Sequence, residues 1–325
     1  GSSVGRVTFE QPTPLPGAPS LRVGVIGAGR VGAVLGAALR KAGHDVVAVS
    51  GVSEASRERA EALLPGVPVQ QPAGVAAAAD LVLLTVPDDE LAALVHGLGF
   101  PGTLGPRIVV HTSGAQGIGV LAPVVEAGGV PLAIHPAMTF SGTAVDLTRL
   151  AGCPFAVTAM PDHRMVADAL VLDMGGEPFT VDEADRTQYH AALAHGSNHL
   201  VTLVAQAGEL LRRIDVDDPG RLLRPLLEAA LDNALERGDK ALTGPVARGD
   251  AGTLTRHLDM LEALAHTGVA LDIPPTYRAL ALATAQRSSA RGALTPMQID
   301  AVLTALEGRG GPPDQGGVGP EPPTP

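Results

Sequence analysis

The sequence has one cysteine, no tryptophan, two tyrosines and five phenylalanines. A single cysteine, Cys153, excludes an internal disulfide. No partner for a nucleophile lies in Gly152-Cys153-Pro154-Phe155, so a small buried apolar side chain is expected there. The first 20 residues also lack the basic start and apolar stretch of a secretory signal. These absences predict a cytoplasmic protein.

Basic residues are scarce as well. The 23 Lys and Arg residues face 34 Asp and Glu residues, for a formal net charge of -11, so few groups can neutralise a phosphate backbone. Few aromatic rings are available for base stacking, which further disfavours a nucleic-acid partner. The longest apolar run, 75–86, is broken by Asp80 and falls short of the roughly 18 residues of a membrane span. No membrane partner is expected.

Glycine and proline are abundant, and they gather at both ends of the chain. Prolines recur between 11 and 20, and glycine and proline dominate after Gly308. Such composition cannot build a packed core, so disordered tails are predicted at 1–20 and 308–325. The length of 325 residues, at roughly 150 per domain, suggests two domains between the tails.

The first predicted domain, 21–182, alternates β-branched runs with Ala/Leu-rich stretches. This alternation is typical of βαβ units, and it predicts a Rossmann-type parallel sheet in an α/β domain. Strands are expected at 21–26, 46–49, 81–85, 108–111, 131–135 and 155–158. Helices are expected between them at 30–41, 54–64 and 89–96.

The second predicted domain, 183–307, is all-α. Strand signals end near Asp182, and apolar residues then recur every three or four positions. Helices are expected at 185–213, 219–237, 250–266, 275–291 and 294–306. In the helix over 219–237, leucines and alanines from Leu222 to Leu235 are interpreted as one apolar stripe.

A glycine-rich turn follows the first predicted strand and opens the first predicted helix. It consists of Gly27, Ala28, Gly29, Arg30, Val31 and Gly32. In a GxGxxG turn, the first glycine allows the tight turn, the second lets a pyrophosphate approach and the third packs helix against strand. The strand, turn and helix together predict a dinucleotide site.

The end of the second predicted strand indicates which dinucleotide binds. An acidic residue there would bond the ribose hydroxyl of NAD, whereas this chain has Ser50 and Ser53, followed by Arg57. Hydroxyls and a guanidinium suit a 2′-phosphate, so NADP (NADPH) is the predicted cofactor, and Arg30 could reach the same region. The alternative for Arg57 and Arg59 is a solvated helix face.

Three further strand ends should border the nicotinamide and the substrate, because ligands bind beyond the carboxyl ends of strands in such sheets. The cofactor-binding candidates there are Val86, Pro87, His111 and Ser113, and the substrate-pocket candidates are His135, Met138 and Thr139. Each has a structural alternative. Asp88 could cap a helix beginning at Asp89, and the serine and histidine side chains could bond the loop backbone.

The first helix of the second domain has a polar face. At 100° per residue, His190, Ala194, Ser197 and Asn198 share one side, while His195 and His199 point away. This face suits a small polar ligand, although the small side chains could instead allow close helix packing. His195 and His199 have the spacing of a zinc pair, but no third ligand accompanies them, so no metal is predicted.

A shaped loop from Leu242 to Asp250 separates two predicted helices. Arg248 in this loop could hold a substrate carboxylate with two parallel hydrogen bonds, or it could tie the loop to a neighbouring acid. Asp250 is expected to cap the following helix.

With these motifs, the chain resembles a bacterial family of Rossmann-like oxidoreductases whose helical C-terminal domain is of unknown function. The resemblance covers 21–306 and rests on the glycine turn, His135-Pro136, Tyr189-His190 with Ser197-Asn198, and the Thr243 to Asp250 loop. The family is similar to 6-phosphogluconate dehydrogenase, whose C-terminal domain the helical part resembles, to pyrroline-5-carboxylate reductase and to ketopantoate reductase. The resemblance implies NADPH-dependent reduction of 2-dehydropantoate in pantothenate biosynthesis, Tyr189 and Ala194 at the substrate pocket, and a homodimer formed through the helical domain.

One departure affects the chemistry. Ketopantoate reductases carry Lys-x-x-x-Asn in the corresponding helix, and aligning the asparagine with Asn198 places Ala194 at the lysine position. The leading hypothesis is a keto-acid reductase in which His190 supplies or relays the proton, Ser197 and Asn198 orient the carbonyl, and Arg248 holds the carboxylate. Alternatives are a non-catalytic NADP sensor, an imine or deazaflavin-linked reductase, and a prephenate-like oxidoreductase, to which His135 to Met138 is similar.

Overall fold

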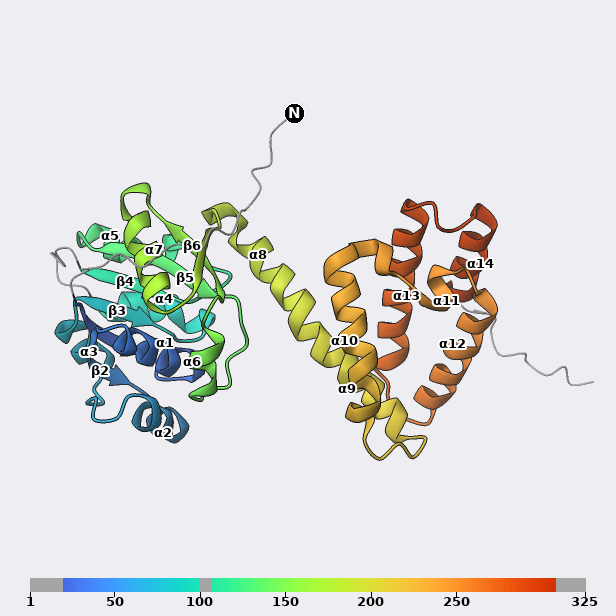
Figure 1. Cartoon of the computed structure of the whole chain (residues 1–325), viewed down its shortest axis with the longest axis horizontal. Helices are drawn as coiled ribbons and strands as arrows, with labels where there is room; N and C mark the ends of the chain where they lie inside the picture. The colour runs from blue at the N-terminus through green and yellow to red at the C-terminus, as the bar shows by residue number, and fades with distance from the viewer. Residues whose placement is uncertain (1–19, 100–106, 308–325) are drawn as a thin grey trace, which may run out of the picture. The chain divides into compact units, whose positions relative to one another are not determined.

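The computed structural model describes residues 20–99 and 107–307 (Figure 1). The chain divides into two compact units, of which the first extends to Asn198 and the second begins at His199. Except for Ser20, the predicted tails lie outside the described residues. They therefore stay predictions.

A seven-stranded sheet lies at the centre of the described part of the first unit, in the order β2-β1-β3-β4-β5-β6-β7. The strands are β1 (Arg22–Ile26), β2 (Asp45–Ser50), β3 (Leu81–Leu84), β4 (Ile108–His111), β5 (Val130–Pro136), β6 (Pro154–Ala159) and β7 (Glu177–Thr180). Strand β1 pairs in parallel with β2 on one side and β3 on the other. The chain thus passes from β1 to β2 on one side and then crosses back to β3 on the other, which makes the carboxyl ends of β1 and β3 a topological switch point.

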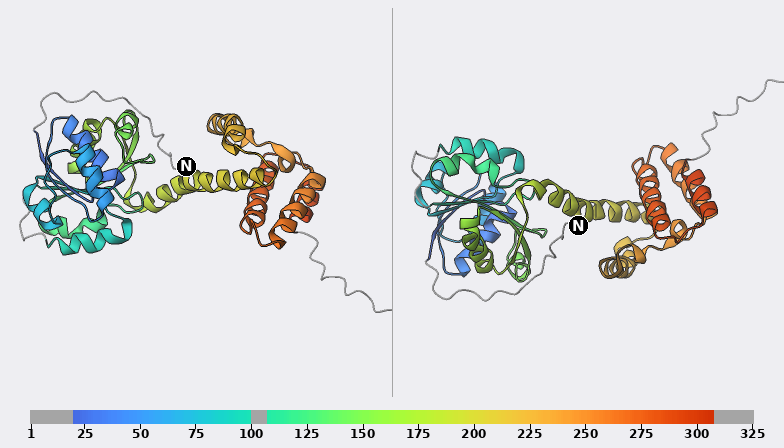
Figure 2. Two further views of the ribbon diagram at one scale, coloured as in Figure 1. Left: turned by 90° about the horizontal axis from the view of Figure 1, so that it is seen from below. Right: turned by 90° about the horizontal axis from the view of Figure 1, so that it is seen from above.

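Helices cover both faces of the sheet (Figure 2). They are α1 (Arg30–Lys41), α2 (Glu54–Leu63), α3 (Pro72–Ala78), α4 (Asp88–Gly97), α5 (Ala122–Glu126), α6 (Val145–Arg149) and α7 (Arg164–Asp173), with 3-10 turns at Ile118–Leu121, Pro161–His163 and Glu183–Asp185. Residues of α1, α2 and α7 form one apolar core with the sheet, and residues of α3, α4 and α5 form the other. Because both faces are covered, the central strands are apolar throughout rather than alternating.

All six predicted strands are confirmed, each within one residue of its expected ends. The predicted parallel sheet is confirmed except at one pairing, where β6 runs antiparallel to β5. The segment between these strands returns to the same end of the sheet, where the Ala137 N–H donates to the Pro154 carbonyl at 2.9 Å. The short edge strand β7, whose sequence is EPFT, was missed because it contains a proline and lacks a β-branched run.

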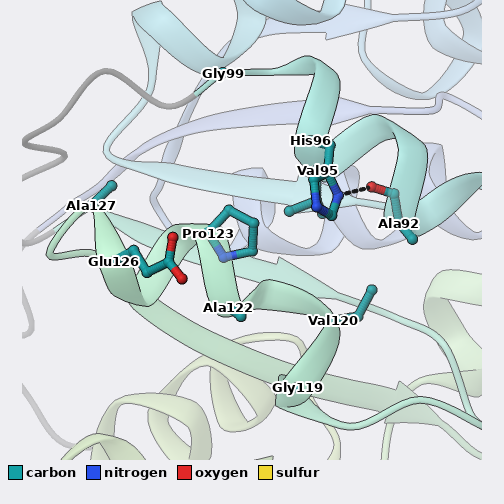
Figure 3. A pocket seen from close by; sticks show the side chains of 10 residues that line it. All are labelled: Ala92, Val95, His96, Gly99, Gly119, Val120, Ala122, Pro123, Glu126 and Ala127. Atoms are coloured by element: carbon teal, nitrogen blue, oxygen red, sulfur yellow. Dashed lines mark hydrogen bonds between the residues drawn. The ribbon is translucent and has the colours of Figure 1, made fainter.

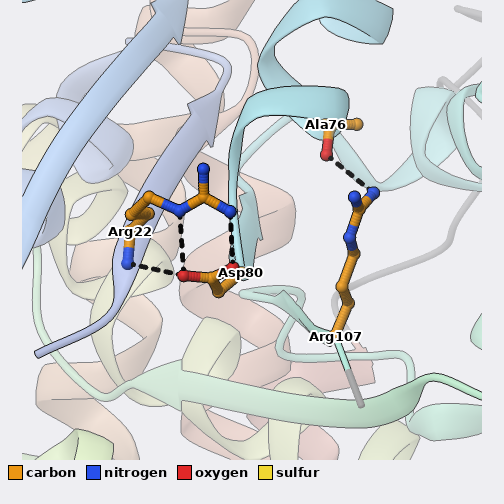
Figure 4. Close-up of polar contacts among 4 residues, drawn as sticks. All are labelled: Arg22, Ala76, Asp80 and Arg107. Atoms are coloured by element: carbon orange, nitrogen blue, oxygen red, sulfur yellow. Dashed lines mark hydrogen bonds and ion pairs between the residues drawn. The ribbon is translucent and has the colours of Figure 1, made fainter. Parts of the chain in front are cut away.

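The amino ends of the strands are joined by charged contacts (Figure 4). The Arg22 guanidinium donates to Asp80 through Nε and Nη2, at 3.1 and 2.9 Å, and these bonds hold the pKa of the carboxyl below its usual range. Arg107 donates to the Ala76 carbonyl at 3.5 Å. These contacts brace the sheet at the end opposite the glycine turn.

The boundary between the units falls after Asn198, whereas the sequence placed it between 182 and 183. The reason is α8 (Arg186–Leu193), whose first residue is only 1% exposed and hydrogen-bonds to carbonyl groups of the sheet. The predicted helix over 185–213 is not continuous. A π-helical turn, Ala194–Asn198, separates α8 from α9 (His199–Arg212) and shifts the helical phase of the residues that follow.

The second unit is helical, as predicted. Beyond α9 it contains α10 (Pro219–Arg237), a 3-10 turn (Gly238–Ala241), α11 (Gly244–Ala247), α12 (Ala251–His266), α13 (Ile273–Ala290) and α14 (Pro296–Glu307). Its core joins α12, α13 and α14 through Leu254, Leu258, Ala281, Ala285, Val302 and Leu306. In the described parts of the chain, no helix has both the length and the apolar character needed to cross a bilayer.

Most of the apolar residues predicted on helix α10 are exposed. Only Pro219 and Leu223 are buried along it. The exposed leucines are Leu222, Leu226, Leu231 and Leu235, with exposed fractions of 49%, 64%, 49% and 77%. The sequence pattern identified the helix correctly, but it did not show what the apolar side chains contact.

Candidate active site

The turn between β1 and α1 is built around Gly27, whose φ of +98° lies in the region that favours glycine. Its N–H lies 3.2 Å from both the carbonyl and the hydroxyl oxygen of Ser50. The Thr85 hydroxyl donates to the Gly27 carbonyl at 2.6 Å. A Cβ on Gly32 would lie only 2.2 Å from the Gly27 carbonyl oxygen and from Thr85 Oγ1. Thr85, which sequence reasoning missed, therefore helps to set the turn.

Gly29 is open where Gly27 and Gly32 are crowded. The nearest atom to a Cβ built on Gly29 is 4.0 Å away, so a ligand can approach the backbone closely. Gly29 is also the N-cap of α1, and no side chain caps this helix end. The N–H groups of the first turn and the helix dipole therefore favour an anion at this position. This cradle fits the pyrophosphate of a dinucleotide.

Three arginines lie on the helices that follow β1 and β2. Among the described residues, the side chains of Arg30, Arg57 and Arg59 make no ion pair or hydrogen bond. Arg30 and Arg59 converge on Gly142, where a Cβ would lie 3.0 Å from Arg30 Cγ and from Arg59 Nε. For Arg59, the sequence suggests only a place on a solvated helix face. Its approach to Arg30 depends on the loop after β5, which the local sequence does not place.

The two serines at the end of β2 have structural partners. Ser50 is 6% exposed and accepts from the Gly27 N–H, so its side chain has a structural partner, and its contact with the cofactor stays a prediction. Ser53 caps α2 by accepting from the Ser56 N–H at 3.1 Å, and it remains exposed. The close turn at Gly27 draws Ser50 inward, whereas Ser53 stays at the surface.

The end of β3 carries Val86, which is half-buried, and Pro87, which is exposed. Pro87 is the N-cap of α4, and Asp88 is the first residue of that helix. The alternative in which Asp88 caps a helix beginning at Asp89 is therefore wrong. Asp88 instead adds negative charge to the first turn, where the helix dipole favours it.

The end of β4 contains His111, which is fully buried. Its Nε2–H donates to the Gly117 carbonyl at 2.8 Å, and its Nδ1 accepts from the Ser113 N–H at 3.2 Å. Burial lowers the pKa of His111 to about 4. Both ring nitrogens hold the loop, which favours the structural alternative, and a cofactor contact for His111 stays a prediction. Ser113 is 6% exposed and caps the same turn by accepting from the Gln116 N–H.

Beside this loop, the end of β5 brings His135 against α8. His135 Nδ1 lies 2.8 Å from the Tyr189 hydroxyl, and the rings of His135 and His190 meet edge to face with centroids 6.1 Å apart. Burial lowers the pKa of His135 to about 4 and raises that of Tyr189 to about 12. A Cβ on Gly114 would lie 2.6 Å from His190 Cδ2 and 3.0 Å from His135 Nε2. Glycine at this position therefore leaves room for both imidazoles.

Arg186 lies beneath this cluster and is almost completely buried. Its guanidinium donates to the carbonyl groups of Ser113, Ala133 and Ala156 and to the Thr158 hydroxyl, at 2.7 to 3.2 Å. Burial lowers the pKa of Arg186 to about 10, so it remains charged near neutral pH. Sequence reasoning missed Arg186, because an arginine at the start of a helix ordinarily faces solvent.

Glu183, in the turn before α8, secures the same loop. Its carboxylate accepts from the Ile118 N–H at 2.7 Å and from the Gly119 N–H at 3.0 Å. A Cβ on Gly117 would lie 2.0 Å from this carboxylate. The loop after β4 is thus held from one side by Glu183 and from the other by Arg186.

A pocket of about 160 Å³ lies over these residues. It is lined by His135, Ala137, Met138, Thr139, His190, Leu193, Ala194, Ser197 and Asn198. This pocket is lined by all of the substrate and catalytic residues predicted in the first unit except Tyr189. Tyr189 instead hydrogen-bonds to His135, which lines the pocket. The π-helical turn carries Ala194, Ser197 and Asn198. The sequence therefore identified residues that the fold brings together.

The remaining predicted catalytic residue, Arg248, belongs to the second unit. Its carbonyl accepts from Gln298 Nε2 at 3.1 Å, and among the described residues its side chain has no ion-pair partner. Asp250 caps α12 by accepting from the Thr253 N–H at 3.0 Å, as predicted.

Two other features are separate from this pocket. Cys153 is 6% exposed, and burial raises the pKa of its thiol to about 11, consistent with the expected small apolar role. Within 20–99 and 107–307, no group of three His, Cys, Asp or Glu side chains could hold a metal ion. A hollow of about 590 Å³ between α4 and α5, with His96 and Glu126 at its wall, contains none of the predicted site residues (Figure 3).

Two protein families match the chain. Residues 14–136 match a Rossmann-like domain, and residues 153–284 match a domain of unknown function, DUF2520. The first match ends with β5, and the second includes β6, β7 and the helices through most of α13. A search of curated proteins returned no match.

Solved structures share the fold over most of this chain. A Bacteroides fragilis protein described as an NADP oxidoreductase is 23% identical, with a TM-score of 0.67, covering 82% of this chain and 98% of its own. The TM1727 protein of Thermotoga maritima is 19% identical, with a TM-score of 0.59 and coverages of 83% and 99%. An imine reductase from Myxococcus stipitatus, solved with NADP⁺, is 18% identical, with a TM-score of 0.53 and coverages of 88% and 99%.

The buried histidines predict acid sensitivity. His111 and His135 have pKa values of about 4 in the folded chain, below the ordinary 6.5, so the unfolded chain binds protons first as pH falls. Their contribution to stability is complete above pH 6.5 and is lost as pH falls toward 4, by up to about 1.4 kcal/mol per pH unit for each histidine. Urea unfolding between pH 7.5 and 5 should show this loss.

His135→Gln removes one of these titrating groups and should reduce the slope of stability against pH. His96→Gln, at an exposed position on α4, is the matched control and should leave the slope unchanged. Equal slopes in the parent and His135→Gln would contradict the buried neutral state.

Proposed function

We propose that this chain, which joins a Rossmann-like domain to a DUF2520 domain, is an NADP-dependent reductase of a small keto acid. One observation carries the proposal. The pocket that contains His135, His190, Ser197 and Asn198 lies beyond the carboxyl end of β5, in the same sheet whose β1 ends in the glycine turn. A cofactor site and a substrate site at the same edge of one sheet suit hydride transfer from the bound cofactor to the bound substrate.

The cofactor residues divide by chemistry. Gly27, Gly29 and Gly32 with the first turn of α1 hold the pyrophosphate, and Val86 and Pro87 border the route toward the nicotinamide. Arg30 and Arg59, with Ser53 and Arg57 nearby, receive the 2′-phosphate of NADP. NADPH supplies a hydride when bound, and its preference over NADH follows from these guanidinium groups.

The pocket residues act on the keto acid. As hydride forms a bond to the carbonyl carbon, the π electrons move to the oxygen, which takes a proton from His190. The keto acid is thereby reduced to a hydroxy acid and the nicotinamide is oxidised. Ser197 and Asn198 orient the carbonyl, and Ala194 leaves space where related ketopantoate reductases have lysine. Arg248 is proposed as the ligand of the substrate carboxylate because a guanidinium can bind a carboxylate through two parallel hydrogen bonds.

The resemblance to ketopantoate reductase makes 2-dehydropantoate the first substrate to test, and pantothenate biosynthesis the corresponding role. The likeness to an imine reductase makes an imine the second substrate to test. A cytoplasmic location belongs to the same proposal, supported by the single buried cysteine.

A homodimer formed through the helical unit is also proposed. Exposed leucines along α10, together with Val201 on α9 at 70% exposed, leave a large apolar surface on the second unit. Burying one such leucine against a second copy stabilises it by about 1.5–3 kcal/mol, so a few of them can hold two chains together.

The first test measures NADPH oxidation by the purified chain with 2-dehydropantoate. Turnover dependent on the keto acid is expected, and His190→Ala should lower kcat about 10²- to 10⁴-fold, the effect of losing a positioned general acid. NADPH binding should persist in this variant. Tight NADPH binding without oxidation of any keto acid or imine would favour a sensor instead.

A second test concerns cofactor choice. Arg59→Ala should raise the KM for NADPH by about tenfold or more, because a charge-assisted hydrogen bond to phosphate is lost, and should leave the KM for NADH unchanged. Arg57→Ala, on the same helix, gives the comparison for the residue first predicted from sequence. An unchanged KM for NADPH in Arg59→Ala would remove Arg59 from the phosphate site.

The dimer is tested by sedimentation velocity. The parent chain should sediment as a dimer, and the double variant Leu226→Glu with Leu235→Glu should sediment as a folded monomer. Met297→Glu, at an 80% exposed position on α14, is the control and should stay dimeric. A monomeric parent would refute the proposal.

A further inference from the structure

The reaction proposed above uses His190 as the acid, yet His135 also lines the pocket. His135 Nδ1 is occupied by the Tyr189 hydroxyl at 2.8 Å. Its Nε2 has no hydrogen-bond partner among the described residues and lies beside Gly114, whose lack of a side chain keeps this nitrogen uncovered. A ring held at one nitrogen and open at the other is arranged to contact a ligand.

The direction of the Tyr189 contact determines which nitrogen of His135 carries hydrogen. Burial raises the pKa of the phenol to about 12, so Tyr189 keeps its proton. A phenol is a stronger hydrogen-bond donor than a neutral imidazole, and an imidazole nitrogen is the stronger acceptor. Tyr189 therefore donates to Nδ1, which leaves the hydrogen of His135 on Nε2, the nitrogen without a hydrogen-bond partner among the described residues.

The charged groups around His135 oppose its protonation. Arg186 and His190 face it from α8, and His111 faces it from β4, so each titratable neighbour that acts on its charge is basic. Burial has the largest effect, and these neighbours add to it, giving a pKa of about 4. The Glu183 carboxylate is engaged with the Ile118 and Gly119 N–H groups instead. The imidazole is thus neutral throughout the physiological range.

Arg186 also determines the position and the field of the ring. Its hydrogen bonds join β5, the strand that carries His135, to its two neighbours, the loop after β4 and strand β6. Among the described residues Arg186 forms no ion pair, and carbonyl and hydroxyl oxygens accept its hydrogen bonds. The Glu183 carboxylate acts on its charge without pairing with it. A buried cation that is not directly paired favours negative charge developing nearby.

We propose that His135 is a catalytic residue that stays neutral and donates its Nε2–H to the oxygen of the substrate carbonyl, with Tyr189 and Arg186 as its positioning residues. The inference rests on the proposed reductase function and assigns the two pocket histidines different work. His190 gives up a proton, whereas His135 keeps its own and stabilises the oxygen as negative charge develops there. The substrates that fit this arrangement have a carbonyl oxygen that becomes an alkoxide during hydride transfer.

The state of His135 is tested by NMR of the ¹⁵N-labelled full chain without substrate. The signal is assigned by its loss in His135→Gln. We expect one tautomer, with hydrogen on Nε2 and a bare Nδ1, and no protonation above about pH 5. Hydrogen on Nδ1, or protonation near pH 6.5, would overturn the inference.

Variants of the positioning residues give independent readouts. Tyr189→Phe should produce a mixture of the two His135 tautomers, and Arg186→Met should raise the pKa of His135 by about one unit or more. Arg186→Lys keeps the charge and should keep the pKa low. If Arg186→Met misfolds, the spectra of the parent chain and of Tyr189→Phe still test the inference. An unchanged single tautomer in Tyr189→Phe would contradict the role of Tyr189.

Kinetics separate the two histidines. His135→Ala should lower kcat about 10²- to 10³-fold, the effect of losing one such donor. His135→Gln, which retains an N–H donor, should recover part of this loss. If the chain shows the expected His135 tautomer but reduces no keto acid, the proposed function is wrong and the inference about His135 is not contradicted. If the chain reduces a keto acid but carries the His135 hydrogen on Nδ1, the inference is wrong and the proposed function is not contradicted.

Discussion

The buried guanidinium of Arg186 is the contact on which the site depends. A charge so deeply buried is costly unless its donors are satisfied, and here four hydrogen bonds to Ser113, Ala133, Ala156 and Thr158 satisfy them. Because these acceptors belong to β5, β6 and the loop after β4, one side chain sets the relative positions of three strand ends. It also attaches α8, which carries Tyr189 and His190, to the sheet.

The nucleotide end of the sheet depends on a different constraint, the close approach of backbone to backbone. Gly27 and Gly32 are crowded by Thr85 and by each other, while Gly29 is open. Crowding at two positions fixes the shape of the turn, and openness at the third exposes the N–H groups of α1. The same sheet therefore presents an anion cradle after β1 and a polar pocket after β5, and the proposed reaction follows from having both.

The two histidines at the ends of β4 and β5 show how environment assigns different roles to one residue type. His111 uses both ring nitrogens to hold its own loop, so it is structural. His135 lines the pocket, with Nδ1 held by Tyr189 and Nε2 without a hydrogen-bond partner among the described residues. Both lie at the end of a buried strand and look alike in sequence, and only their contacts separate them. The same is true of Ser50, drawn inward by Gly27, and Ser53, left at the surface.

The sequence by itself determined the order of elements, the glycine turn and the polar side of the helix that begins near Tyr189, because these depend on local period and on residues adjacent in the chain. It did not reveal the antiparallel β6, the role of Arg186, the approach of Arg59 to Arg30 or the exposure of the α10 leucines. Each of these depends on segments far apart in sequence, since a side chain becomes buried, paired or exposed only through what other elements place around it. Tertiary structure therefore decided which of the plausible polar residues share a pocket, and which hold the fold in place.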